Sequence, residues 1–401
     1  MKAFRKEMSG IRNLKKKTVL SRILLVVLIC LPMASGAEGF TLPASLEVIE
    51  EEAFAGTAIE NVEFPEPLTT VGDRAFADNP DLEIITFPPT EILTVSDSAF
   101  ENSGVMIRGE EGSYAEEWAE WNEVPFIPVS SGRPAALLIG QTNYRTFEPL
   151  PGSRNDVMAM RGFLNGLSNR FNTTVATDLT GDQMRRVIRS VFSSAKDTDV
   201  SLLYYSGHGK TDFGGTNHGA LVGVDGDDGL LTFAELAGIL SEVRGRVLVI
   251  LDSCYSGAAI TSRKSSKSSG DPLDAFLKDV IASFSGYTQS AEGIRKRSGE
   301  LAVSKFIVIA AARYSEEAGE DSTGKVLNGY PCGVFTYSVL KGMGCVYPQG
   351  AYQGSMPADD GDSLVTLKEI YDYACAEANR IWSVQHAVYY GTDNEVLFRR
   401  D

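Results

Sequence analysis

The sequence is poor in the residues that bind metals and build disulfide frameworks. Three histidines, five cysteines and three tryptophans occur in 401 residues. His218 and His386 are far apart in the chain, so a zinc enzyme is not expected. The cysteines are too few for a disulfide scaffold, and the Gly-x-x-x-x-Gly-Lys-Ser/Thr pattern of nucleotide-binding loops is absent. We therefore expect no metal site and no required cofactor.

Positive charge is also scarce. The chain has 37 Lys and Arg against 53 Asp and Glu, which gives a formal net charge of -16. Because such a surface repels polyanions over most of its area, we expect no nucleic-acid partner. The composition, with 43% hydrophobic and 22% charged residues, is that of a globular protein. The length predicts two folded units.

The apolar run near the N-terminus, residues 23–31, is shorter than the ~20 residues that span a bilayer. It follows a group of basic residues and precedes the small residues 34–37, which is the order of a signal peptide. Cys30 follows Ile29, which is not a small residue, so lipid attachment at that thiol is not expected. We expect residues 1–36 to be a signal peptide, no stable transmembrane span, and a secreted or cell-surface mature protein.

Residues 37–130 contain a recurring pattern. An Ala-Phe pair ends each copy, at Phe54, Phe76 and Phe100, and Phe-Pro pairs begin at Phe64 and Phe87. The period is close to the ~20 to 29 residues of leucine-rich repeats, which fold only when copies stack. The segment resembles the leucine-rich repeats of bacterial surface proteins. It predicts a short solenoid, which is either a spacing module or a docking surface for a substrate, a cell wall or another protein.

The pattern changes after the small and breaking residues 130–134, and residues 131–401 form the second expected domain. Continuous apolar runs there predict strands of a parallel sheet that is covered by helices on both faces. The expected strands are 135–139, 200–205, 246–251 and 306–310, and the expected helices are 156–167, 183–192, 233–240, 335–343 and 367–382. Stretches rich in Ser, Lys, Arg and Gly within about 261–300 predict an exposed internal linker.

Two expected strands end in the residues of a nucleophilic site. His208 follows the strand 200–205, and Cys254 follows the strand 246–251. The carboxyl ends of parallel strands meet at one edge of a sheet, where ligands bind. A thiolate is a strong nucleophile, and an imidazole can take and return its proton. The glycines beside both residues allow close approach of a substrate, and the amides of Gly209 and Cys254 can receive an oxyanion.

The motifs "YSGHG" and "DSCYSG" resemble those of the caspase-like cysteine peptidases, in particular the metacaspase and paracaspase branch. The similarity runs from about Pro134 to the end and includes "ALLIGQTNY", "SRNDV" and "GVFTYSVLKG". Most metacaspases have His where Tyr255 stands here, a departure that leaves His208 and Cys254 intact. The resemblance implies an α/β fold with a caspase-like, mainly parallel sheet flanked by helices, preceded here by the short leucine-rich-repeat solenoid.

The resemblance also implies which acids bind the substrate. Asp252 matches the residue that lines the primary specificity pocket of metacaspases and paracaspases, Asp156 matches a second acid, and Glu316 a third. Carboxylates prefer Arg or Lys, and Arg can pair with them bidentately. The alternatives are helix capping for Asp156 and a solvated surface for Glu316. The resulting hypothesis is an exported endopeptidase that cleaves proteins or peptides after Arg or Lys.

Two other functions remain open at this point. An aspartate-specific peptidase would need a basic residue in the pocket, for which Arg154 is the candidate. A non-catalytic surface adhesin would use the caspase-like domain as a scaffold. The enzyme hypothesis adds self-processing within the linker, where basic residues offer the side chain that an acidic pocket accepts. The candidate cleavage positions are Arg263, Lys264, Lys267, Arg295, Lys296 and Arg297.

Two smaller features have open interpretations. The acidic segment from Asp225 to Glu235 does not fit an EF-hand, because the first and third ligand positions fall on Val224 and Gly226. An irregular calcium site and an acidic turn before a capped helix are the two readings. Cys332 and Cys345 either pair in an oxidising compartment or remain two buried thiols.

Overall fold

The computed structural model describes most of the chain after residue 39. The described residues are 40–90, 92–129, 132–166, 171–211, 219–255, 305–311, 319–324, 327, 329–361, 364–383, 385, 387–390 and 396–399. For Cys254 and Tyr255 it describes the main chain. The expected signal peptide and internal linker lie outside these residues, as do His218 and His386. None of the described helices has the length and apolar composition that a membrane span requires.

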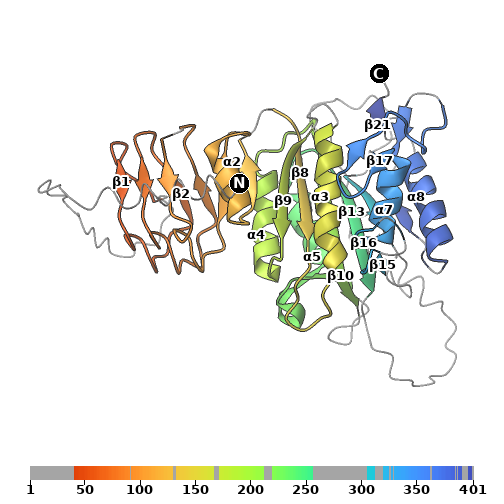
Figure 1. The fold of residues 1–401 in the computed structure, drawn as a ribbon, viewed down its shortest axis with the longest axis horizontal. Coiled ribbons are helices and arrows are strands. Elements are labelled where there is room, and N and C mark those ends of the chain that lie inside the picture. Colours follow the sequence, from red (N-terminus) through yellow and green to blue (C-terminus); the bar gives the residue numbers. More distant parts are fainter. Residues whose placement is uncertain are drawn as a thin grey trace, which may run out of the picture. The chain divides into compact units, whose positions relative to one another are not determined.

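The repeats form two small parallel sheets (Figure 1). One sheet contains β1 (Val48–Ile49), β3 (Thr70–Val71) and β5 (Thr94–Val95). The other contains β2 (Asn61–Glu63), β4 (Ile84–Thr86), β6 (Met106–Gly109) and β7 (Phe126–Pro128). The helix α2 (Tyr114–Trp121) follows β6. The segment is therefore a solenoid in which each copy adds one short strand to each sheet.

The Ala-Phe pairs explain why the copies stack. The ring of Phe76 lies 5.1 Å from that of Phe54 and 5.9 Å from that of Phe100, so each copy continues one aromatic column. The buried Asn79 side chain donates hydrogen bonds to the carbonyl oxygens of Phe54 and Phe76. Trp118 of α2 closes the column, because its ring contacts Phe100 at 5.2 Å.

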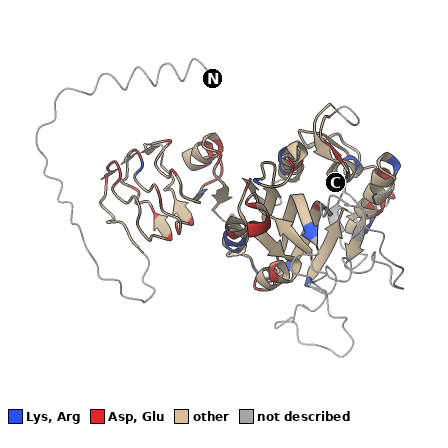
Figure 2. Cartoon of the chain, turned by 90° about the horizontal axis from the view of Figure 1, so that it is seen from below, with Lys and Arg blue, Asp and Glu red and all other residues tan. Residues whose placement is uncertain are grey.

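The net negative charge of the chain is concentrated in the repeats. Residues 40–129 contain twenty Asp and Glu and, as basic residues, only Arg74 and Arg108. In the cartoon of Figure 2 the acidic residues, coloured red, mark the repeat turns and α2, with few basic residues among them. This distribution makes the solenoid an unfavourable surface for polyanions.

The rest of the chain forms the predicted α/β fold around an eight-stranded sheet. Its parallel strands are β9, β8, β10, β13 and β14, in that spatial order. Antiparallel strands extend it: β20 pairs with β14, and β11 and β12 continue from the far end of β10. The bounds are β8 Ala135–Gly140, β9 Asn172–Thr177, β10 Val200–Thr211, β11 Gly219–Val222, β12 Leu230–Thr232, β13 Arg246–Tyr255, β14 Phe306–Ala310 and β20 Val388–Tyr390.

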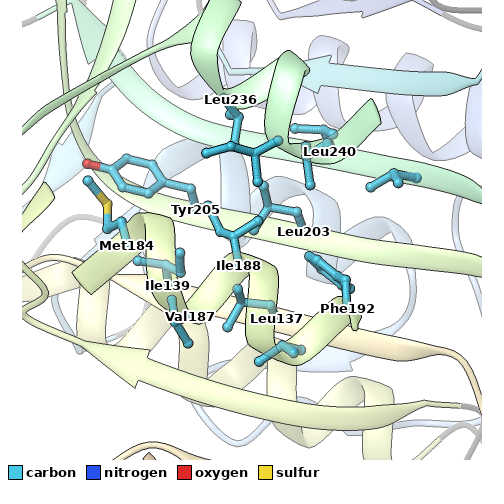
Figure 3. Packing of buried hydrophobic residues seen from close by; sticks show 14 of the residues in the cluster. Leu137, Ile139, Met184, Val187, Ile188, Phe192, Leu203, Tyr205, Leu236 and Leu240 are labelled. Atoms are coloured by element: carbon cyan, nitrogen blue, oxygen red, sulfur yellow. The ribbon is translucent and has the colours of Figure 1, made fainter. Parts of the chain in front are cut away.

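Helices cover both faces of this sheet. On one face α4 (Gly181–Phe192) and α5 (Phe233–Ser241) pack on side chains of β8 and β10, as Figure 3 shows for Ile188, Leu236 and Leu137. On the other face lie α3 (Pro151–Gly166), α7 (Val334–Gly342) and α8 (Leu367–Ile381). The helix α3 begins five residues before its predicted start, because Pro151 favours the first position of a helix.

Short elements complete the described structure. A 3-10 helix, Gly226–Gly229, precedes β12. Three two-stranded sheets lie outside the main sheet: β15 (Glu320–Asp321) with β16 (Cys332–Gly333), β17 (Cys345–Val346) with β18 (Ala351–Tyr352), and β19 (Leu364–Thr366) with β21 (Val396–Arg399). Cys332 and Cys345 are both free thiols and do not pair with each other; Cys332 is buried, as the second reading expects, whereas Cys345 is only half-buried.

The repeats and the α/β domain share buried surface. Ile84, Met106 and Ile127 of the repeats belong to the same buried cluster as residues of β8 and α4. Polar contacts also join the two parts: the Arg161 guanidinium lies 3.1 Å from the Glu116 carboxylate, and Arg186 donates to the carbonyl oxygen of Pro80. The solenoid is therefore packed against the α/β domain.

Candidate active site

His208 and Cys254 lie side by side on the two central strands. β10 and β13 are parallel, and their register makes His208 the Cα partner of Cys254, two residues beyond the pair Ser206 and Asp252. Adjacent strands are about 4.8 Å apart. The sequence motifs are thus brought together at the carboxyl end of the sheet, as their strand-end positions predict.

The His208 ring is held by a main-chain carbonyl and two aromatic rings. It is 6% exposed, with the Tyr144 ring at 4.6 Å and the Phe147 ring at 5.4 Å. Its Nε2 lies 2.8 Å from the carbonyl oxygen of Glu148. A carbonyl only accepts, so Nε2 carries the proton. Nδ1 is buried and has no hydrogen-bond partner among the described residues, which leaves its lone pair available.

Burial lowers the pKa of His208, and the Glu148 carbonyl opposes that shift. The imidazole is therefore neutral and able to accept a proton near pH 7. The main chain around it is equally constrained. Its amide donates to the Tyr144 hydroxyl at 2.7 Å, and its carbonyl accepts from Tyr205 at 2.8 Å. Any side chain at Gly207 would lie 2.6 to 2.7 Å from these two hydroxyls, so glycine is needed there.

Asp156 and Asp252 meet beside the first turn of α7. Asp156, from α3, is 1% exposed and accepts hydrogen bonds from Ser206 Oγ, Gly333 N and the Tyr347 hydroxyl. Asp252, from β13, is 5% exposed, and it accepts from the amide and hydroxyl of Thr336. Both carboxylates therefore interact with the amides at the helix N-terminus, which is a stabilising position for acids.

Gly333 is the point where the two aspartates converge. A methyl group there would collide with the Asp252 carboxylate and lie 3.0 Å from Asp156 Oδ2. Glu320 is the residue opposite Gly333 in the β15–β16 pair, and its Oε1 accepts from the Gly152 amide at 2.7 Å. Asp156, Asp252 and Glu320 thus form one group, which we call the carboxylate cluster.

The carboxylate cluster has no basic partner among the residues that the structure describes. Within the described part of the chain, none of its three carboxylates forms an ion pair with Lys or Arg. Burial raises the pKa of Asp252 to about 6, opposed by hydrogen bonds from Thr336, and raises that of Glu320 to about 7. The pKa of Asp156 is raised well above its usual range, first by burial and then by the neighbouring Asp252 charge. A bound cation would relieve both effects.

Glu320 is the one member of the carboxylate cluster that was not predicted from the sequence. The predicted third acid, Glu316, lies outside the described residues. Glu320 belongs to the same acidic segment, "SEEAGED", and no local pattern distinguishes it from its neighbours. Its strand pairing with Gly333, which lies beside the two aspartates, distinguishes it. Tyr347 was also missed, because it reaches Asp156 from a distant hairpin.

The remaining predicted residues lie elsewhere or outside the described chain. Arg154 is exposed, and its guanidinium is 3.1 Å from Glu123 of the repeats, so it is not part of the carboxylate cluster. Gly209 lies in β10 opposite Leu221 and Tyr255. The six candidate self-cleavage positions lie outside the described residues.

Three of the four acids in the 225–235 segment have partners within the protein. Asp225 accepts from the Gly181 amide, Asp227 pairs with Lys210, and Glu235 lies 2.7 Å from Arg185. Thr232 caps α5 by accepting from the Glu235 amide. In the described part of the chain, no group of three or more His, Cys, Asp or Glu is placed to hold a metal ion.

Comparison with known proteins identifies the families of the two parts of the chain. The family model "Caspase domain" matches residues 133–345, and "BspA type Leucine rich repeat region" matches residues 33–107 in six copies. No curated protein matches the chain. Solved structures that resemble it include a Geobacter sulfurreducens protein, with TM-score 0.41, 18% identity and coverage of 65% of this chain and 94% of that one. Another is caspase-1 from Spodoptera frugiperda, with TM-score 0.41, 10% identity and coverage of 66% and 88%. Because the caspase model covers more than half of the sequence, the chain belongs to the caspase-domain family of cysteine peptidases and carries BspA-type leucine-rich repeats before that domain.

Proposed function

We propose that this protein is an exported cysteine endopeptidase of the metacaspase type that cleaves after Arg or Lys. Cys254 is the nucleophile, and His208 is its general base and acid. The observation that carries this proposal is His208: its Nε2 is hydrogen-bonded to a carbonyl, its Nδ1 has no partner among the described residues, and its position on β10 is paired with that of Cys254 on β13. A base with one fixed proton and one free lone pair is what thiol activation requires.

The reaction proceeds through a thioester. Nδ1 of His208 takes the proton of the Cys254 thiol, and the thiolate attacks the carbonyl carbon of the scissile bond. The amides of Gly209 and Cys254 stabilise the resulting oxyanion. His208 then gives its proton to the leaving amine, and the Cys254 thioester forms as the peptide bond breaks. Water, deprotonated by His208, hydrolyses the thioester and restores the thiol.

Specificity for a basic residue rests on the carboxylate cluster. A guanidinium or ammonium group reaching Asp156, Asp252 and Glu320 would supply the cation that these buried acids lack, and Arg could pair bidentately. An acidic substrate side chain would meet like charges there instead. This disfavours an aspartate-specific enzyme, whose candidate residue Arg154 pairs with Glu123.

The alternative function is a non-catalytic surface adhesin in which the caspase domain is a scaffold. The helix-capping contacts of Asp156 and Asp252 are compatible with that role, since they stabilise α7 whether or not a substrate binds. In both cases we propose that the repeats hold the protein at a surface or a protein partner. The two functions differ in one respect only, which is whether peptide bonds are cut.

Cleavage-site mapping on a denatured protein mixture separates the two functions. The purified mature protein should generate new C-termini that are Arg or Lys, and Cys254→Ala should generate none. Parallel digests with chelator and with added calcium test whether the metal is required. A mixture left uncut under all these conditions would support the adhesin, and new C-termini at Asp would contradict the proposed specificity.

We also propose self-processing between the two catalytic strands. Wild-type protein should split with new ends in 263–267 or 295–297, where the candidate basic residues occur. N-terminal sequencing of the fragments identifies these ends, and Cys254→Ala should remain whole. A fully active wild-type enzyme that is intact through this segment would exclude processing as the activation step.

A further inference from the structure

Residues 142–148, which we call the His208 strap, join β8 to α3 and hold the catalytic imidazole. Tyr144 accepts the His208 amide hydrogen, Phe147 packs on the ring, and the Glu148 carbonyl accepts from Nε2. The strap contains no helix or strand. Its position, and therefore the position of the Glu148 carbonyl, depends on contacts with other parts of the chain.

Asp178 is the side chain that anchors the start of the strap. Its Oδ1 accepts hydrogen bonds from the main-chain amides of Thr142 at 2.6 Å and Asn143 at 2.9 Å. Its Oδ2 accepts from Nδ2 of Asn143 at 2.7 Å. Further along, the amide of Arg145 donates to the Val224 carbonyl. One carboxylate thus takes three hydrogen bonds from two successive strap residues.

Asp178 is itself held in an unusual conformation. Its φ of 54° lies in the left-handed region, which residues other than glycine rarely adopt. Its amide donates to the Gly140 carbonyl. The buried Gln141 side chain holds the next residue, Leu179, by donating to its carbonyl oxygen and accepting from its amide. Strained positions that are fixed this firmly tend to occur at functional sites.

We propose that Asp178 is a positioning residue for catalysis: by anchoring the strap it keeps the Glu148 carbonyl on Nε2 of His208. This inference rests on the proposed role of His208 as the base. A proton fixed on Nε2 leaves Nδ1 free to accept the proton of Cys254. If the strap moved, the Nε2 hydrogen bond would be lost, and the imidazole would populate the tautomer with the proton on Nδ1, which cannot act as a base at that atom.

Nitrogen NMR of the His208 ring tests the tautomer directly. The chain has only three histidines, and a His208→Gln spectrum assigns the signal. In a Cys254→Ala background we expect protonation at Nε2, and in Cys254→Ala with Asp178→Ala a mixture of both tautomers. Asp182→Ala is the matched control, because Asp182 is an exposed acid four residues away that pairs with Arg185 and does not contact the strap. A single Nε2-protonated form in the Asp178→Ala protein would overturn the proposal.

Kinetics of the otherwise intact enzyme provide the second measurement. Asp178→Ala should lower kcat on an Arg peptide by about 10- to 100-fold, the usual range for a misplaced catalytic group, while KM stays nearly constant because the carboxylate cluster is untouched. Asp182→Ala should leave both constants unchanged. A kcat for Asp178→Ala equal to that of wild type would also overturn the proposal.

A swapped pair covers the case in which Asp178→Ala does not fold. Asn143→Asp places two carboxylates against each other at this contact, and adding Asp178→Asn restores a donor and an acceptor there. The pair should recover kcat relative to the single Asn143→Asp variant, and equal kcat values for the two proteins would contradict the anchoring role. The NMR measurement does not depend on turnover. If the wild-type protein cleaved no peptide, the proposed function would be refuted, but the NMR spectra would still show whether Asp178 fixes the His208 tautomer.

Discussion

The His208 site and the carboxylate cluster are two buried parts of one sheet edge, and burial acts on them in opposite directions. It lowers the pKa of His208, whose ring is hydrogen-bonded to a carbonyl. It raises the pKa of Asp252 to about 6 and of Glu320 to about 7. In each case the uncharged form is favoured. In the proposed mechanism, burial therefore keeps the His208 base neutral for the thiol, while the acids need a cation to become fully charged.

Removing either member of the catalytic pair should have the largest effect. Cys254→Ala and His208→Ala should each lower kcat at least ~10³-fold, since a nucleophile and its base act as one unit. Thermal unfolding should change little, because both residues are at the end of strands that remain paired. Wild-type-like turnover by purified Cys254→Ala protein would show that another nucleophile acts.

Removing a charge from the carboxylate cluster should weaken substrate binding and leave the chemistry at His208 largely unchanged. Asp252→Asn keeps the shape and an acceptor oxygen for Thr336 but loses the charge. A lost charge-assisted partner typically costs ~1.5–3 kcal/mol, so kcat/KM for Arg peptides should fall by roughly one to two powers of ten. Steady-state kinetics should place most of that loss in KM. An unchanged kcat/KM would mean that the basic side chain binds elsewhere.

Glu320→Gln should have a similar but smaller effect. Glu320 is less buried than the two aspartates, so solvent weakens its interaction with a bound cation. The amide oxygen of Gln can still accept from Gly152. We expect kcat/KM for Arg peptides to fall several-fold, within the ~0.5–1.5 kcal/mol of an ordinary hydrogen-bond change. A larger loss than that of Asp252→Asn would reverse the ranking of the acids.

The pH dependence should be the mildest effect and should follow the cluster. Asp252 and Glu320 lose protons as pH rises through about 6 to 7, so the affinity for Arg peptides should increase over that range. One released proton changes affinity by at most about tenfold per pH unit. Because the pKa of His208 is lowered, this histidine titrates at lower pH than an ordinary one, so kcat should vary less than KM. Profiles of kcat and KM from pH 5.5 to 8 distinguish this pattern from one in which the titration of His208 controls kcat.

Local sequence patterns predict part of the site. Two apolar runs, followed by His208 and Cys254, predict two buried parallel strands with both residues at one edge of the sheet. The observed register pairs the two residues. The edge strand β9 was missed, because its Asn-Thr-Thr segment is polar and its residues are buried only alternately. An edge strand with one covered face lacks the continuous apolar run that marks a central strand.

Contacts between distant segments explain the other omissions. Glu320 joins the cluster through its pairing with Gly333, and Tyr347 reaches Asp156 across 191 residues of sequence. The strap contacts of Asp178 likewise bridge about 35 residues. Glu320, Tyr347 and Asp178 belong to no motif, and their roles arise from tertiary packing. The strand-end positions therefore predicted that His208 and Cys254 lie side by side, and the family resemblance pointed to Asp156 and Asp252, while Glu320 and the supporting contacts required the structure.

A comparison of Arg and citrulline peptides tests the central claim most directly. Citrulline keeps the length and shape of Arg and removes its charge. At pH 7.5 the account predicts that wild-type enzyme cleaves the Arg peptide with a kcat/KM at least ~10-fold above that of its citrulline analogue, and that Asp252→Asn narrows this ratio. Equal kcat/KM values for the two peptides in the wild-type enzyme would contradict it.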